Sequence, residues 1–276
     1  MSTTVRVELP SGRAIALRPV GDEDEAFILD TADSMLPGAR ATALVERCLA
    51  NDEPAPALTI GDRDAALLHL RRLSLGESVD CALPCPSVGC GESLEWQVPV
   101  SDLLIEPDAT GGAPELFTID VDAEGARFHV TFRLPTAADV DRVATQGADR
   151  IEHAAQMLFR QCVIGAERDD VGCTAADLPA TVRSAVEDAL AAADRQAEIQ
   201  LAMRCPACGL EFTSLFDTAV FFLRELDARA TRTLRDIHLL ALHYHWSESD
   251  ILRMPARRRA QYIELVRNAM ARGRPR

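Results

Sequence analysis

Two short cysteine turns, far apart in the chain, restrict what this sequence can fold into more than any other feature. The first, CPSVGCG, spans residues 85–91, and the second, CPACG, spans residues 205–209. The residues around the two turns can also be aligned, so that each half indicates a strand, a tight turn and a returning strand. This order is typical of a zinc ribbon, in which two β-hairpin turns face each other and each presents two thiolates.

The spacing of the turns predicts a Zn²⁺ site whose ligands are Cys85, Cys90, Cys205 and Cys208. Four thiolates complete a tetrahedral shell and leave no position for a reactive water, so the predicted site is structural. The glycine after each second cysteine lets backbone N–H groups point at sulfur. The alternative is that four thiols align without holding a metal. A redox role for the second turn is disfavoured, because strands flank it and a thioredoxin-like motif opens a helix.

Cys81 lies just before the first turn and is the competing ligand. In the alignment of the two halves it takes the position of Leu201, on the face of the incoming strand that packs. We therefore interpret Cys81 as a small buried hydrophobe. Replacement of Cys85 or Cys90 by Cys81 as a ligand stays open at this point.

The composition indicates a globular chain in a reducing compartment. Of the 276 residues, 47% are hydrophobic, and no apolar run approaches the roughly 20 residues of a membrane span. The N-terminus has neither the basic nor the apolar region of a signal peptide. We therefore expect a cytoplasmic protein whose eight cysteines are thiols or metal ligands.

Charge is distributed unevenly along the chain. The formal net charge is −14, but residues 251–276 hold eight arginines against one acid, Glu264, and so carry +7 while the remainder carries −21. The acidic body disfavours general nucleic-acid binding, which needs a basic face. The basic end is expected to be a solvated helix face or to pair with an acidic protein. The candidate partner-binding residues are Trp246, Arg253, Arg257, Arg258 and Arg259.

Periodicity and turn residues predict an α+β fold that is mainly helical. A hairpin is expected over residues 5–20, and helices over 21–35 and 39–50, separated by Pro37-Gly38. A helix over 59–78 is expected to be capped by Asp62 or Asp64 and to end at Gly76. Thr136 and Asp139 form a capping-box pattern, and Ser247 with Asp250 forms a similar one. Residues 123–125 are a hairpin-turn signal, and Pro255 suits the first turn of the last helix. Further helices are predicted over 150–163, 181–198, 215–246, 247–254 and 255–272, and strands over 78–85, 93–100, 117–122, 126–134 and 198–205.

These elements suggest a small antiparallel zinc-ribbon-like unit interrupted by a long helical insertion. We expect five segments along the chain, and residues 110–115 look like a loop or linker. The segments are 1–57 (hairpin and short helices), 58–135 (helix, first half of the ribbon and hairpin), 136–195 (helical insertion), 196–217 (second half of the ribbon) and 218–276 (helical end).

The motifs that would carry catalysis are absent. The sequence has no HExxH, GxSxG or GxGxxG pattern, and no H-x-E beside the cysteines. A Walker lysine is impossible because the chain contains no lysine. We expect no enzymatic activity and no small-molecule substrate.

Three stretches together resemble the T4-type baseplate proteins, often called baseplate hub assembly chaperones. They are residues 58–104, which contain the first cysteine turn, residues 205–217 (CPACGLEFTSLFD) and residues 234–266. Such proteins are encoded among the tail genes of contractile phages and phage-tail-like contractile injection systems. Cysteine turns are not always present in that family, so the zinc prediction depends on spacing alone.

The resemblance implies a non-enzymatic assembly factor or structural component of a baseplate or hub. Its partners would be baseplate or hub proteins, without a membrane, and it would be cytoplasmic or associated with an assembling virion or injection-system particle. The second hypothesis is a zinc-ribbon adaptor or regulatory protein that contacts nucleic acid through its Arg-rich C-terminal helices.

Overall fold

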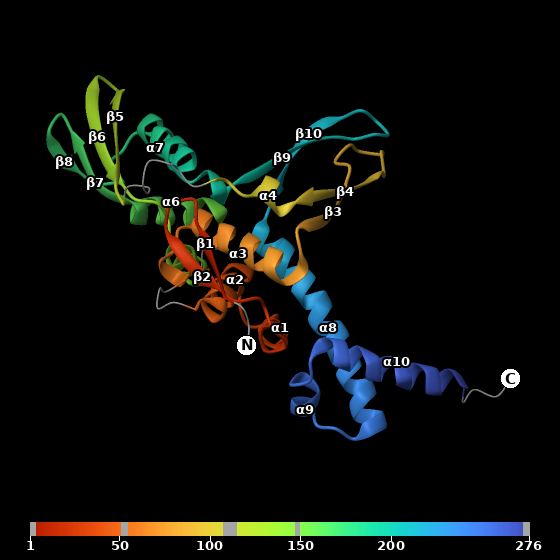
Figure 1. Cartoon of the computed structure of the whole chain (residues 1–276). Helices are drawn as coiled ribbons and strands as arrows, with labels where there is room; N and C mark the ends of the chain where they lie inside the picture. Colours follow the sequence, from red (N-terminus) through yellow and green to blue (C-terminus); the bar gives the residue numbers. More distant parts are fainter. Residues whose placement is uncertain (1–3, 51–54, 107–114, 147–149, 273–276) are drawn as a thin grey trace. The chain divides into compact units, whose positions relative to one another are not determined.

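The computed structural model describes residues 4–50, 55–106, 115–146 and 150–272, which form two compact units. The first unit contains residues up to Pro19 and from Leu36 to Phe222, and the second contains Val20–Met35 and the residues from Leu223 onward. Helices and small antiparallel sheets alternate along the chain, so the predicted α+β class is confirmed (Figure 1). The loop predicted at residues 110–115 falls almost entirely outside the described residues.

The first unit begins with the predicted hairpin. Strands β1 (Val5–Glu8) and β2 (Ala14–Leu17) pair antiparallel, and helix α2 (Pro37–Cys48) follows in the same unit. The expected break at Pro37-Gly38 is wrong, because both residues belong to the first turn of α2. Proline has no N–H to lose there and its fixed φ suits a helix start.

Helix α3 (Ile60–Leu75) is the central helix of the first unit and is buried on nearly all sides from Gly61 to Arg71. Its predicted cap was wrong. Thr59 is the N-cap, and its hydroxyl accepts the backbone N–H of Asp62. The predicted end at Gly76 is confirmed, with a φ of 97° that favours glycine.

Strands β5 (Phe117–Ala123), β6 (Ala126–Phe132), β7 (Val163–Arg168) and β8 (Val171–Cys173) form one antiparallel sheet in that order. Helices α5 (Ala137–Thr145) and α6 (Ile151–Cys162) lie between β6 and β7 in sequence. Helix α7 (Ala180–Ala193) lies beside this sheet in Figure 1. Its Val182 and Val186 belong to the same apolar cluster as the phenylalanines of β6. The predicted turn at residues 123–125 joins β5 and β6.

Strands β7 and β8 were not predicted. The sequence VIGAER has no clear alternation of apolar and polar residues, and Val163 was expected to end a helix. Pairing with β6 is what makes this segment a strand, with Val130 opposite Ala166. Tertiary pairing therefore decides the structure here, as it often does for β-strands.

Two further hairpins contain the cysteine turns. Strands β3 (Ser78–Pro84) and β4 (Ser93–Pro99) form the first, and β9 (Ile199–Arg204) and β10 (Glu211–Phe216) form the second. Each is a separate two-stranded sheet, and the two lie side by side in Figure 1. Short helices η1 (Ala55–Ala57), α4 (Val100–Leu103) and η2 (Arg195–Ala197) complete the unit.

A polar contact ties the second hairpin to the central helix. Asp194, just before η2, accepts the backbone N–H of Gly61 at 3.0 Å at the start of α3. A Cβ at position 61 would lie 1.8 Å from the Asp194 carboxylate, so only glycine fits. Gln196 donates to the carbonyl of Leu103 and accepts the N–H of Ile105. Residues 91 positions apart are thereby held together.

The second unit contains helices α1 (Asp22–Asp30), α9 (Glu248–Leu252) and α10 (Ala256–Arg272), and most of α8 (Thr218–Tyr244). Its apolar core joins Leu240 of α8, Ile251 of α9 and Ile263 of α10. The predicted Ser247 cap is confirmed, whereas Pro255 lies just before α10 and not within its first turn.

Ion pairs connect α1 to the other helices of the second unit. Arg259 donates to the carboxylate of Asp22 at 2.6 Å, and Arg229 pairs with Glu25 at 2.5 Å. Burial raises the pKa of Glu25, although Arg229 acts to lower it. Removing one partner of a buried pair of this kind leaves the other charge buried and unpaired, which strongly destabilises a protein.

None of the helices among the described residues combines the length and the apolar character needed to cross a bilayer.

The predicted capping box at the start of α5 is confirmed and is extended by an arginine. Thr136 and Asp139 exchange the two expected bonds, and Arg133 adds a bidentate contact to Asp139 at 2.6 and 3.0 Å. Burial alone would raise the pKa of Asp139, but the bonds from Arg133 and Thr136 outweigh it and hold that pKa well below its ordinary value. The ionised carboxylate is therefore the form that stabilises the fold.

Replacing this carboxylate, Asp139→Ala, should lower the free energy of unfolding by about 2–4 kcal/mol, because a cap and a buried ion pair are lost together. Because the pKa of Asp139 is lower in the folded than in the unfolded state, its carboxylate stabilises the fold above about pH 4, and this stabilisation is lost on acidification. The difference from wild type should therefore shrink below about pH 4. Denaturant unfolding across pH measures it, with the exposed Asp122→Ala as control. If Asp139→Ala lowered the free energy of unfolding by no more than the control does, the stabilising role of the Asp139 carboxylate would be contradicted.

Candidate metal centre

Each cysteine turn is closed by its own backbone. In the first, the N–H of Cys85 donates to the carbonyl of Glu92 at 2.8 Å, and in the second the N–H of Cys205 donates to Leu210 at 2.9 Å. Gly91 and Gly209, directly after the second cysteines, have φ values of 70° and 75°. This left-handed conformation strains other residues, so glycine allows each chain to curl back around its sulfurs.

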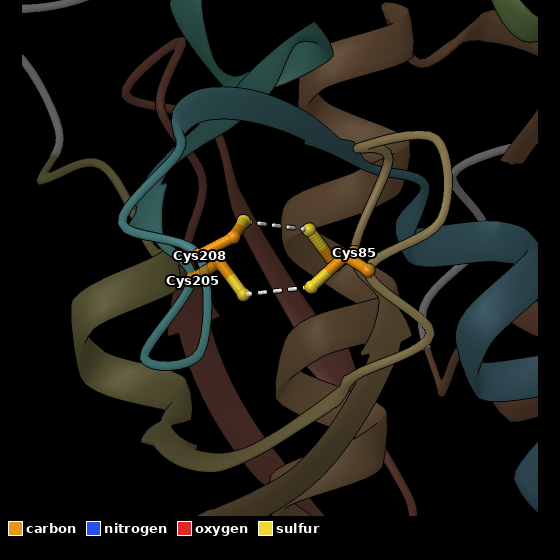
Figure 2. Close-up of side chains that lie close together, drawn as sticks. Cys85, Cys205 and Cys208 are labelled. Atoms are coloured by element: carbon orange, nitrogen blue, oxygen red, sulfur yellow. Dashed lines mark hydrogen bonds between the residues drawn. The ribbon is translucent and has the colours of Figure 1, made fainter.

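The structure brings together all four cysteines that the spacing predicted. The sulfur atoms of Cys85, Cys90, Cys205 and Cys208 all lie within 4.8 Å of one another. Cys85 lies 3.7 Å from Cys208, and Cys90 lies 3.7 Å from Cys205. Figure 2 shows the sulfurs of the two turns pointing toward one another from opposite sides.

These distances fit a single metal ion better than disulfides. A tetrahedron with metal–sulfur bonds of about 2.3 Å has sulfur–sulfur edges of about 3.8 Å. A disulfide would need a sulfur–sulfur separation of about 2.05 Å. All eight cysteines are in fact unbridged. The arrangement could therefore hold one metal ion and no reactive water.

The four thiols differ in exposure and in pKa. Cys205 is buried, Cys85 and Cys90 are half-buried and Cys208 is exposed. The backbone N–H groups of Cys208 and Ala207 lower the pKa of Cys205 to about 7. The backbone at Ser87 acts to lower the pKa of Cys85, but partial burial and the neighbouring thiols outweigh it and raise that pKa to about 12. A bound cation is what would allow all four groups to be thiolates together.

Cys81 lies below the centre, in an apolar cluster. Its side chain is 6% exposed and packs in a cluster with Val79 of the same strand and with Ile199 and Leu201 of β9. The interpretation of Cys81 as a small buried hydrophobe is therefore confirmed. The cluster joins the two hairpins beneath their cysteine turns and aligns the turns tip to tip.

The residues predicted to bind a partner lie in the second unit, and they differ in exposure. Trp246 is half-buried and stacks on Tyr244, with ring centroids 4.6 Å apart. Arg253, Arg257 and Arg258 are exposed. Arg259, by contrast, is buried in its ion pair with Asp22, so its guanidinium acts within the chain. This pairing could not be predicted from sequence, because the two residues are 237 positions apart.

A family model described as the T4 bacteriophage base plate protein matches residues 1–223, which is most of the chain.

The chain belongs to this T4 baseplate family. The resemblance inferred from the cysteine-turn segments is thereby confirmed, and the match extends it to the N-terminal hairpin. The match ends at residue 223, so residues 234–266, which also contributed to the resemblance, lie beyond it. No curated protein and no solved structure matches the chain. Membership supports a structural component of a phage baseplate and favours a non-enzymatic role.

Proposed function

We propose that Cys85, Cys90, Cys205 and Cys208 bind one structural Zn²⁺ ion. The observation that carries this proposal is the convergence of four sulfurs within 4.8 Å from turns that are 114 residues apart in sequence. Thiolates select Zn²⁺, Cu⁺ or iron, and a closed tetrahedral four-sulfur shell favours Zn²⁺ or an iron–sulfur centre. The 3.7 Å edges support one ion in preference to a cluster, whose sulfurs would be spread around several irons.

The metal would close a long loop. It would join the tips of the β3–β4 and β9–β10 hairpins, between which the four-stranded sheet and helices α5 to α7 leave and return. Closing a loop of that length should stabilise the first unit by several kcal/mol, on the order expected for a structural zinc site.

We also propose that the protein is a non-enzymatic assembly factor or structural component of the baseplate or central hub of a contractile tail or tail-like injection system. Membership of the baseplate family supports this role. The exposed arginines Arg253, Arg257 and Arg258 are proposed to contact an acidic face of another baseplate or hub protein, with Trp246 beside them. Charge complementarity of this kind sets partner choice and association rate.

The metal prediction concerns stoichiometry. Elemental analysis of purified protein should find about one zinc per chain, as a closed four-thiolate site requires. Cys205→Ser should abolish binding, whereas Cys81→Ser should keep it, because Cys81 lies in the apolar cluster. Replacement by Co²⁺ gives an independent check through the visible bands of a tetrahedral thiolate site. Equal loss of metal in both variants would refute the ligand assignment.

Removing the metal should destabilise the first unit. A strong chelator is expected to lower the unfolding midpoint of the wild-type protein, since loop closure through the ion is lost. The Cys205→Ser variant, already without metal, should show no further change. A metal-containing wild-type protein that keeps its midpoint after chelation would rule out the structural role.

The assembly prediction concerns partners. Tagged full-length protein should co-purify with tail, hub or baseplate proteins encoded beside it. Arg257→Glu/Arg258→Glu should weaken this capture more than the control Arg6→Glu/Arg160→Glu, which makes the same charge change at exposed sites in the first unit. Failure to bind any such component would refute the proposed baseplate or hub role. Salt-dependent retention on DNA, lost in the first variant, would instead favour nucleic-acid contact.

A further inference from the structure

The second unit contains one strongly acidic and one strongly basic helix. Helix α1 holds five acidic residues and no basic one, and α10 holds five arginines against one glutamate. The pairs Asp22–Arg259 and Glu25–Arg229 neutralise part of this charge within the unit. Asp30 and Glu248, within the part of the chain that the structure describes, have no ion-pair partner.

These two acids line a pocket whose wall is partly aliphatic and partly acidic. It has a volume of about 110 Å³ and is formed by α1, α8 and the start of α9. Of its aliphatic lining residues, Leu29, Ile237 and Leu252 are buried or half-buried, and we call them its floor, whereas Leu234 is 45% exposed. Asp30 and Glu248 are exposed, and we call them its rim, whereas Asp22 and Glu25 also line the pocket but are held in their ion pairs. The volume equals that of about four waters, so one large aliphatic side chain would fill it.

Helix α10, in the same unit, exposes a large aliphatic side chain near its C-terminal end. Along α10, Arg259, Ile263 and Val266 share one face with Met270, at helical spacings of four, three and four. The first three are buried, but Met270 is 53% exposed. The apolar face of α10 therefore continues past its packed part. Met270 is followed by three further arginines in the sequence, and methionine adapts readily to irregular pockets.

Met270 cannot enter the pocket of its own chain. Arg259 is held by Asp22, which itself lines the pocket. Met270 is eleven residues further along an unbroken helix, about 16 Å along its axis. A continuous helix cannot fold back over that distance, so an occupant of the pocket must come from another molecule.

We propose that the acidic pocket of the second unit (Leu29, Leu234, Ile237 and Leu252, with Asp30 and Glu248 on the rim) receives the Met270 end of α10 from a second copy of this chain. The two surfaces are complementary in both respects, since an aliphatic side chain meets an apolar floor and a basic helix end meets a free acidic rim. Such a contact is heterologous, so it joins copies head to tail into a ring or an open chain. It requires neither the metal nor the proposed baseplate role.

Sedimentation velocity of the full-length protein over a concentration series tests this contact. Association should appear at low salt and weaken at high salt, because the rim pairs are exposed. Leu234→Glu and Met270→Glu should each raise the dissociation constant by about tenfold or more, since each removes an anchor. Glu248→Arg supplies a third probe, which reverses the rim charge and leaves the apolar floor intact.

Matched controls exist on the same two helices. Leu242→Glu on α8 and Leu265→Glu on α10 change leucines that are 61% and 58% exposed, outside the two surfaces, and should associate as wild type does. A mixture of the Leu234→Glu and Met270→Glu variants should form a dimer and nothing larger, because one intact pocket and one intact helix end remain. A wild-type protein that stays monomeric up to about 1 mM overturns the proposal. Equal losses in the control variants, or an unchanged dissociation constant in both test variants, also overturn it.

Discussion

The packing of two β-hairpins against each other is the contact on which the rest of the first unit depends. Val79 and Cys81 of one hairpin share a cluster with Ile199 and Leu201 of the other, although more than a hundred residues separate them. We call this apolar contact between the hairpins the seam. The chain between the two hairpins, which includes the four-stranded sheet and the helix that covers it, therefore begins and ends at the seam. The four thiols lie at the hairpin tips, so a metal there would fix a junction that apolar packing has already aligned.

The features that could be predicted from sequence are those decided by neighbours in the chain. Thr136 and Asp139 bond across three residues, Gly76 ends a helix through its own φ, and each cysteine turn is closed within its hairpin. The convergence of the four cysteines belongs to this group in part, because the two local turns with matching residues could be recognised far apart in the sequence. The two turns meet because the seam beneath them holds the hairpins together. The alternating apolar residues of the seam could also be recognised in the sequence.

What escaped prediction depends on partners far away in sequence. The β7–β8 strands follow from pairing with β6, since their own residues carry no strand pattern. The burial of Arg259 follows from Asp22, and the placement of α1 in the second unit follows from the same pair and from Glu25 with Arg229. No spacing rule links residues 237 positions apart, so an exposed basic face was expected where one arginine is in fact buried.

The route of the chain has a consequence for how this protein can be divided. The polypeptide passes between the two units three times, after Pro19, after Met35 and within α8 after Phe222. The family match ends almost at the last of these crossings, yet α1 lies inside the matched residues and packs with helices beyond them. A fragment cut at residue 223 would keep α1 but lose Arg229 and Arg259, and it would leave Glu25, which is 1% accessible in the whole chain, without its partner Arg229. The family segment is thus not a separable module, and its N-terminal helix has its folding partner in the part of the chain that the match does not reach.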